Sequence, residues 1–151
     1  MREILFRGKR VDNGEWVYGD FIENQGSCYI YTASDTTTIP IPSNEQIISV
    51  ICNKIIPETV GQYTGLTDKN GKKIFEGDII KYKNTDGIKF NGVALTVIGK
   101  VVYNEKNASF AISGKDKIGA KYYDYFPIKN IEIIGNIHDN PELLKGGDEN
   151  A

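Results

Sequence analysis

Few side chains in this sequence are of the types that carry out covalent or acid–base chemistry. His138 is the sole histidine, so neither a Ser-His-Asp set nor a histidine-rich metal site is indicated. We interpret it as a packed or capping residue near the chain end. Glu76 and Asp78 would share one face of a strand, but strand-start and turn roles explain them more simply than acid–base catalysis does. We therefore expect no enzyme activity and no catalytic residue.

The cysteines and glycines do not form a recognisable cofactor or metal motif. Cys28 and Cys52 are the only cysteines, and without a CxxC pair or a Cys/His cluster we interpret them as reduced thiols. No glycine-rich phosphate loop is present. The run at residues 68–71 lacks the alternating oxygen ligands of a calcium loop. The expected set of metals and cofactors is none.

Composition and charge exclude several classes of protein. The 151 residues hold 18 Lys and Arg against 20 Asp and Glu, a net charge of -2, which argues against a strongly basic nucleic-acid-binding protein. A hydrophobic share of 40% and a charged share of 25% fit a globular protein rather than a disordered one. Apolar runs are too short to span a membrane, and the charged beginning MREILFRGKR does not resemble a secretory signal. We expect a cytoplasmic protein with no membrane partner.

Short strands must position these residues, because Ile and Val dominate the apolar set and 16 Gly and 9 Tyr suit tight turns and strands. Periodicity does not separate strand from short helix at residues 46–56, and β-branching favours strand there. Gly99 is expected at a bulge or bend. Single helical turns are expected at 58–62 and 140–144. The predicted strands are 15–22, 28–32, 36–39, 46–51, 54–56, 78–82, 93–103, 108–113, 122–126 and 131–137.

Two segments of the chain resemble each other. Residues 8–22 read GKRVDNGEWVYGDFI and residues 65–80 read GLTDKNGKKIFEGDII. Duplication of a β-unit would give this pattern, and would place Asp20 and Asp78 at matching positions at strand starts. Convergence on Asn-Gly turns and Gly-Asp strand starts is the simpler explanation.

Five segments together resemble the YopX family of phage and prophage proteins, over nearly the whole chain. They are FRGK at 6–9, EWVYGD at 15–20, IPETVGQYTGL at 56–66, DKNGKKIFEGDII at 68–80 and IGNIHDNPELL at 134–144. The resemblance implies an origin in a phage or prophage, and hence a location in the cytoplasm of a bacterial host. It also implies that the second half forms a small barrel similar to SH3-like folds. It implies no activity.

We accordingly expect a mainly β protein with little helix. Its parts are an N-terminal β subdomain at 1–60, an SH3-like barrel at 63–145 and a flexible tail at 146–151. The block at 57–77 is expected to consist of loops held in specific turns, since glycine adopts backbone angles closed to other residues. The expected structural turn residues are Gly61, Gly65, Gly71, Gly77 and Asp78.

Aromatic and basic side chains are the best candidates for an interaction surface. Tyr and Trp give a large contact area at a small entropy cost, and small β-domains leave strand edges to pair with partners. We therefore predict a non-enzymatic phage or prophage accessory protein that forms a homo-oligomer or binds an unknown phage or host protein. Nucleic-acid binding is the alternative, with bases stacked on the tyrosines, but the charge balance does not favour it. The candidate residues are Trp16, Tyr18, Lys121, Tyr122, Tyr123 and Tyr125.

Overall fold

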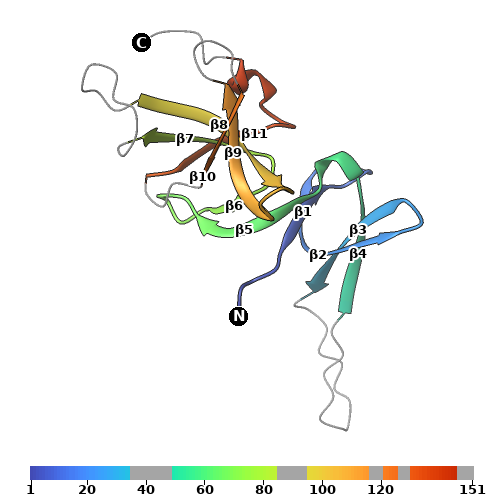
Figure 1. Ribbon diagram of the computed structural model, residues 1–151. Helices are drawn as coiled ribbons and strands as arrows, with labels where there is room; N and C mark the ends of the chain where they lie inside the picture. The colour runs from blue at the N-terminus through green and yellow to red at the C-terminus, as the bar shows by residue number, and fades with distance from the viewer. Residues whose placement is uncertain (35–48, 85–94, 116–120, 126–129, 146–151) are drawn as a thin grey trace. The chain divides into compact units, whose positions relative to one another are not determined.

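The computed structural model describes residues 1–34, 49–84, 95–115, 121–125 and 130–145, which divide into two compact units, Met1–Gln62 and Tyr63–Ala151 (Figure 1). The expectation of a mainly β protein with little helix is confirmed. No helix among the described residues is long and apolar enough to cross a membrane. The elements are β1 Phe6–Lys9, β2 Trp16–Asn24, β3 Ser27–Ser34, β4 Ser49–Ile55, η1 Pro57–Thr59, β5 Gly61–Thr67, β6 Lys73–Phe75, β7 Asp78–Asn84, β8 Leu95–Asn104, β9 Ser109–Lys115, β10 Lys121–Tyr125, β11 Glu132–Asn136 and η2 Pro141–Leu144.

The first unit is a ring of antiparallel strands. Strands β1 to β4 pair in sequence order, and the beginning of β5 returns to pair with β1. The chain after β1 closes the ring, because Arg10 bridges Ile55 and the amide of Val11 donates to the carbonyl of Lys54 at 3.0 Å. The core consists of Cys28, Ile30 and Ile55, with Phe6, Val17, Phe21 and Val60 packed against them.

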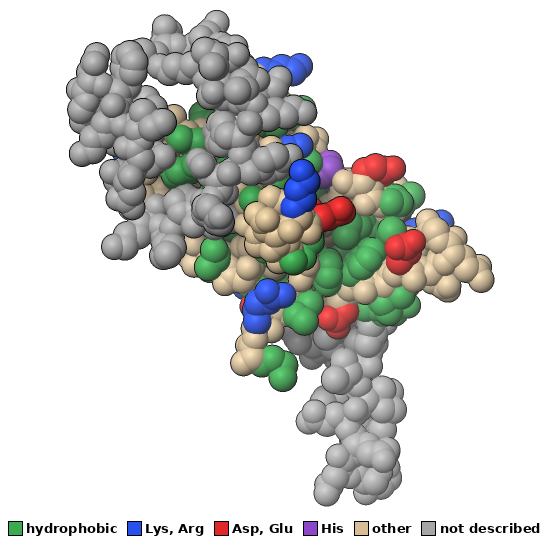
Figure 2. Space-filling view, in the orientation of Figure 1, with side chains coloured by type: hydrophobic (Ala, Val, Ile, Leu, Met, Phe, Trp, Pro, Cys, Tyr) green, Lys and Arg blue, Asp and Glu red, His purple; other side chains and the backbone are tan. Residues whose placement is uncertain are grey.

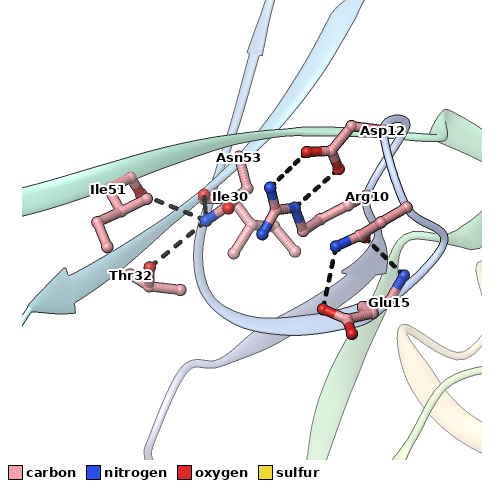
Figure 3. A network of polar contacts seen from close by, with 8 residues as sticks. Arg10, Asp12, Glu15, Ile30, Thr32, Ile51 and Asn53 are labelled. Atoms are coloured by element: carbon pink, nitrogen blue, oxygen red, sulfur yellow. Dashed lines mark hydrogen bonds and ion pairs between the residues drawn. The ribbon is translucent and has the colours of Figure 1, made fainter.

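Polar contacts support the closure of this ring (Figure 3). Asn53 is buried in β4, and its Nδ2 donates to the carbonyl of Ile30 at 3.2 Å and to Thr32 Oγ1 at 3.4 Å. In the turn after β1, Arg10 Nε donates to Asp12 Oδ1 at 2.9 Å, and this bond lowers the pKa of Asp12. Asn53 therefore ties β4 to β3 from the inside.

The second unit contains a five-stranded antiparallel sheet. Strands β7 to β10 pair in sequence order, and β11 returns to pair with β7. The end of β5 forms a hairpin with β6. The core consists of Ile74, Ile80, Tyr82, Val101, Ile112 and Ile131, with Val97 and Ile133 packed against them. The SH3-like barrel that the resemblance implies for this half stays a prediction.

The two units share a strand order. In the first it is β5-β1-β2-β3-β4 and in the second β11-β7-β8-β9-β10. The registers agree as well: Gly19 precedes the β2 residue that pairs with Tyr31, and Gly99 precedes the β8 residue that pairs with Ser113. Next to Gly19, β2 changes its pairing partner from β1 to β3. Next to Gly99, β8 changes its pairing partner from β7 to β9.

Both glycines permit a close approach of strands. A Cβ added at Gly19 would overlap the backbone carbonyl of Tyr31, and one added at Gly99 would lie 2.6 Å from Ile112 Cγ2 and 3.0 Å from the carbonyl oxygen of Ser113. The register of β8 shows no shift at Gly99, so the bulge expected there is wrong. Glycine is needed at this position because the neighbouring strand approaches closely.

The prediction that Asp20 and Asp78 occupy matching positions is wrong. Asp20 lies exposed in the interior of β2, whereas Asp78 begins β7, is buried, and accepts a hydrogen bond from the amide of Phe75 at 2.8 Å. The shared strand order instead matches β1 with β7. The likeness of residues 8–22 and 65–80 therefore reflects common turn chemistry rather than a duplicated unit.

The block at 57–77 was expected to be loops, and this was wrong, because it contains η1, β5 and β6. Strand β5 buries Gly61, Tyr63 and Thr64, a mixed set that shows no apolar alternation. Among the described residues, the predicted strands at 46–51 and 54–56 correspond to the single strand β4, and β1 was not predicted. The strand predicted at 36–39 and the tail at 146–151 lie outside the described residues.

Candidate interaction face

Strand alternation gives the sheet of the first unit two different faces. Phe21 and Ile30 are cross-strand partners on the core side. Their neighbours along each strand point the other way, because successive side chains alternate. We call the outward side the aromatic face; its residues are Arg7, Lys9, Trp16, Tyr18, Asp20, Ile22, Tyr29, Tyr31, Cys52 and Lys54.

Trp16 is held on this face by two cations. Lys9 is its direct partner in the pairing of β1 with β2, and the Lys9 Nζ lies 5.5 Å from the centroid of the indole ring. The Arg7 Cζ lies 4.8 Å from the same centroid. Such cation–π contacts fix the ring over β1. Trp16 is half-buried and stands outside the core cluster of its unit.

Large apolar side chains are exposed along β2 on the aromatic face. Tyr18 is 47% exposed and Ile22 is 46% exposed, and both point outward from β2. Half-buried Tyr29 lies opposite Ile22 on β3. In Figure 2, hydrophobic side chains reach the surface among acidic ones over the first unit. Several large exposed side chains on one sheet face mark an interaction site more often than scattered single residues do.

Cys52 lies at the β4 end of the aromatic face, opposite Tyr31. Hydrogen bonding with Cys52 raises the pKa of Tyr31. Both cysteines are free, and Cys52 is exposed whereas Cys28 is buried on the core side. Burial raises the pKa of Cys28. The two thiols thus lie on opposite faces of the sheet and are not placed to form a disulfide.

The sequence-predicted interaction residues are divided between the two units. Trp16 and Tyr18 lie together on the aromatic face. Lys121, Tyr122, Tyr123 and Tyr125 belong to β10, whose backbone pairs with β9 in the second unit and whose side chains lie outside the described residues. Sequence reasoning missed Tyr29 and Tyr31, although the alternation in CYIYT at 28–32 places both on one face.

Three of the five predicted turn residues have backbone angles that favour glycine. The φ angles of Gly65, Gly71 and Gly77 are 88°, 80° and 83°. Gly61 is different, because its φ is not positive and it lies in β5 opposite Arg7 of β1. The expectation of a special backbone angle at Gly61 is therefore wrong. Asp78 begins β7 as a buried hydrogen-bond acceptor.

Asp68 is a buried hydrogen-bond acceptor whose structural role the sequence did not predict. Its Oδ1 accepts from the amides of Asn70 at 2.8 Å and Lys72 at 2.9 Å, and its Oδ2 accepts from the amide of Ile133 at 3.3 Å. Burial alone would raise the pKa of this carboxyl, but the backbone donors outweigh burial and lower the pKa. Asp68 therefore fastens the turn before β6 to β11. Within the described part of the chain, no three His, Cys, Asp or Glu side chains are grouped so as to hold a metal ion.

Comparison with known proteins assigns the chain to a family. The family model described as YopX protein matches residues 5–145. The crystal structure of protein EF1440 from Enterococcus faecalis is similar over 95% of this chain and 99% of that chain, at 20% identity and a TM-score of 0.47. A likeness at that level carries no argument about function. No match was found among curated proteins.

Proposed function

The chain belongs to the YopX family, and from this premise we propose that it is a non-enzymatic phage or prophage accessory protein that acts by binding protein. The partner to test first is a second copy of the chain, and an unknown phage or host protein is the other. Binding occurs through the aromatic face. The phage or prophage origin is supported by the resemblance of the five sequence segments described above.

The observation that carries the proposal is the exposure of two large side chains on one side of the sheet: Tyr18 next to Trp16, and Ile22 opposite Tyr29 of β3. Covering such side chains removes apolar area from water, and each Å² contributes about 25 cal/mol before the costs of association. Aromatic residues and Arg are also enriched at the centres of protein interfaces.

Charge favours protein over nucleic acid as the ligand of this unit. Residues 1–62 contain five Lys and Arg against eight Asp and Glu, a net charge of -3. A unit with this balance repels a phosphate backbone at long range. The cations Arg7 and Lys9 are engaged with the ring of Trp16, so they position an aromatic side chain within the face.

The test is the molar mass in solution, measured by light scattering across a range of protein concentrations. We expect the wild-type mass to rise above 16.8 kDa with concentration, and the double variant Tyr18→Ser/Ile22→Ser to stay monomeric. The matched control is Leu66→Ser/Tyr103→Ser, which removes side chains of similar exposure, 44% and 45%, from the second unit. The control is expected to associate like the wild type.

A second arm covers a partner other than the chain itself. Wild-type protein is used to capture proteins from nuclease-treated lysate of an infected host, beside both double variants. A protein captured by the wild type and the control, but not by Tyr18→Ser/Ile22→Ser, supports the proposal. A chain that is monomeric at every concentration and captures nothing in this arm contradicts it.

Nucleic-acid binding remains the second candidate function. Its expected residues on β10 lie among side chains outside the described part of the chain. A different observation favours it, namely a set of lysines on β7 and β8.

A further inference from the structure

The outward side of the sheet in the second unit carries lysines. Ile80 and Tyr82 of β7 point into the core, so Lys81 and Lys83 point outward, and both are exposed. Lys100 of β8 pairs with Ile79, which is two residues before Lys81. Lys100 therefore shares the outward side and stands diagonally across from Lys81.

A fourth lysine joins this side from the turn before β6. The Lys69 Nζ lies 2.7 Å from Glu132 Oε2, and Glu132 is the direct partner of Lys81 in the pairing of β11 with β7. We call Lys69, Lys81, Lys83 and Lys100 the lysine face. The carboxylate of Glu132, which adjoins it, is engaged by Lys69.

Glu132, the β11 partner of Lys81, already accepts a hydrogen bond from Lys69, and the partners of the other lysines on β8 and β9 are uncharged. Lys83 lies opposite Thr96, Lys81 opposite Ile98, and Lys100 opposite Ser113. Four lysines and one carboxylate leave a local charge of about +3, on a chain whose net charge is -2. Like charges gathered on one sheet face repel one another, and an anionic ligand would relieve that repulsion.

Among the described residues, the segment of η2 lies over one end of the outward side. A Cβ added at Gly135, the β11 partner of Ile79, would lie 2.9 Å from Leu143 Cδ1 and 2.6 Å from Asn140 Oδ1. The segment of η2, which carries Glu142, therefore covers the end at Ile79. Lys81 and Lys83 lie farther along β7 from that end, and both are exposed.

We propose that the lysine face binds the phosphate groups of a nucleic-acid backbone. Lys81 and Lys83 are two residues apart on β7, about 6.6 Å along the strand, so they reach different phosphates rather than enclose a single anion. The ammonium group is a compact point charge that contacts phosphate without reading a base. Binding is therefore expected to be independent of sequence and sensitive to salt.

The expected salt dependence follows from the number of phosphates that Lys81, Lys83 and Lys100 would contact. Each phosphate neutralised on a single strand contributes about -0.7 to the slope of log affinity against log salt concentration. Three contacts by Lys81, Lys83 and Lys100 give a slope of about -2. The affinity should then fall about 20-fold between about 50 mM and about 200 mM salt.

The experiment measures fluorescence anisotropy of labelled single-stranded and duplex oligonucleotides mixed with the full chain. The variant Lys81→Gln/Lys83→Gln/Lys100→Gln should lose at least tenfold in affinity and most of the salt slope. The matched control Lys54→Gln/Lys106→Gln/Lys145→Gln removes the same charge at exposed positions that are not part of the lysine face, and should keep most of the affinity. Equal thermal unfolding curves establish that both variants fold.

Three results would overturn the proposal. They are the absence of binding at low salt, equal losses in the two triple variants, and binding of a poly-glutamate peptide as tight as binding of the oligonucleotides. The last would assign the face to acidic protein. This proposal is independent of the aromatic face, because Tyr18→Ser/Ile22→Ser is expected to bind oligonucleotide like the wild type; failure of either proposal is thus recognised separately.

Discussion

In the first unit the second strand changes partner at Gly19, and in the second unit at Gly99, with the same strand order around both. The outward sides differ. Residues 1–62 have a net charge of -3 and display Trp16, Tyr18 and Ile22, whereas residues 63–151, with 13 Lys and Arg against 12 Asp and Glu, display lysines on β7 and β8. The comparison teaches that close packing in the core of each unit constrains the order of its strands. Side chains on the outward side are not constrained in this way, so their charge and polarity differ between the units.

The largest effects on stability are expected at Gly19 and Gly99, which occupy corresponding positions in the two units. Gly19→Ala should lower the free energy of unfolding by about 3 kcal/mol, because the new methyl group overlaps backbone that cannot rotate away. Gly99→Ala should cost about 2 kcal/mol, since part of its clash is with the side chain of Ile112. Urea unfolding measures both changes.

The control for this pair is Gly71→Ala. Gly71 has a φ of 80° and no atom within 4 Å of an added Cβ, so only backbone strain of about 1 kcal/mol is expected. A cost at Gly19 or Gly99 no larger than that at Gly71 would show that the close approach of strands is not a shared constraint.

An intermediate effect is expected at Asp68, which has no counterpart on the aromatic face. Asp68→Asn should lower the free energy of unfolding by about 2 kcal/mol at neutral pH. The reason is that both carboxylate oxygens of Asp68 accept backbone hydrogen bonds, whereas the NH₂ group of an amide cannot accept one. Asp20→Asn is the control, since Asp20 is exposed and a change there should stay within about 0.5 kcal/mol.

The pH dependence of stability gives a further check on Asp68. Its pKa is lowered in the folded protein, so the stabilisation is fully present above the unfolded pKa of about 3.9 and is lost as the pH falls through the folded value. Asp68→Asn should remove that part of the acid-side decline. An unchanged difference between wild type and variant across this pH range would argue against the assigned role.

The smallest effects on stability are expected from the variants of the outward sides. Tyr18→Ser/Ile22→Ser and Lys81→Gln/Lys83→Gln/Lys100→Gln change exposed or half-buried side chains outside both core clusters. Each substitution should change the free energy of unfolding by less than about 0.5 kcal/mol. Thermal unfolding checks this, and a large loss in either variant would mean that the residues belong to the packing of the fold.

Much of the fold could be predicted because β-branching and alternation mark the longer strands. The strands that overlap predicted ranges are β2, β3, β4, β7, β8, β9, β10 and β11. Strands β1 (FRGK) and β6 (KIF) were missed because they are too short to show alternation. Strand β5 (GQYTGLT) was missed because its buried residues include Gly and Thr, so it shows no apolar alternation.

The candidate site could be predicted only in part. Trp16 and Tyr18 could be predicted from their residue types. Tyr29 and Tyr31 of the same face lie on another strand, and the local sequence does not determine the register between strands. The lysine face was missed for the same reason. Lys69 and Lys81 become neighbours only through Glu132, which lies far along the chain.

The most direct test of the proposed aromatic face uses Cys52, the exposed thiol on it, with buried Cys28 as the slow internal reference. The rate of maleimide labelling at Cys52 is measured across a range of protein concentrations, for the wild type and for Tyr18→Ser/Ile22→Ser. Self-association through this face predicts that wild-type labelling slows as concentration rises, while the variant keeps its dilute rate. A wild-type rate at Cys52 that stays constant while light scattering shows association would contradict the assignment of the interface to this face.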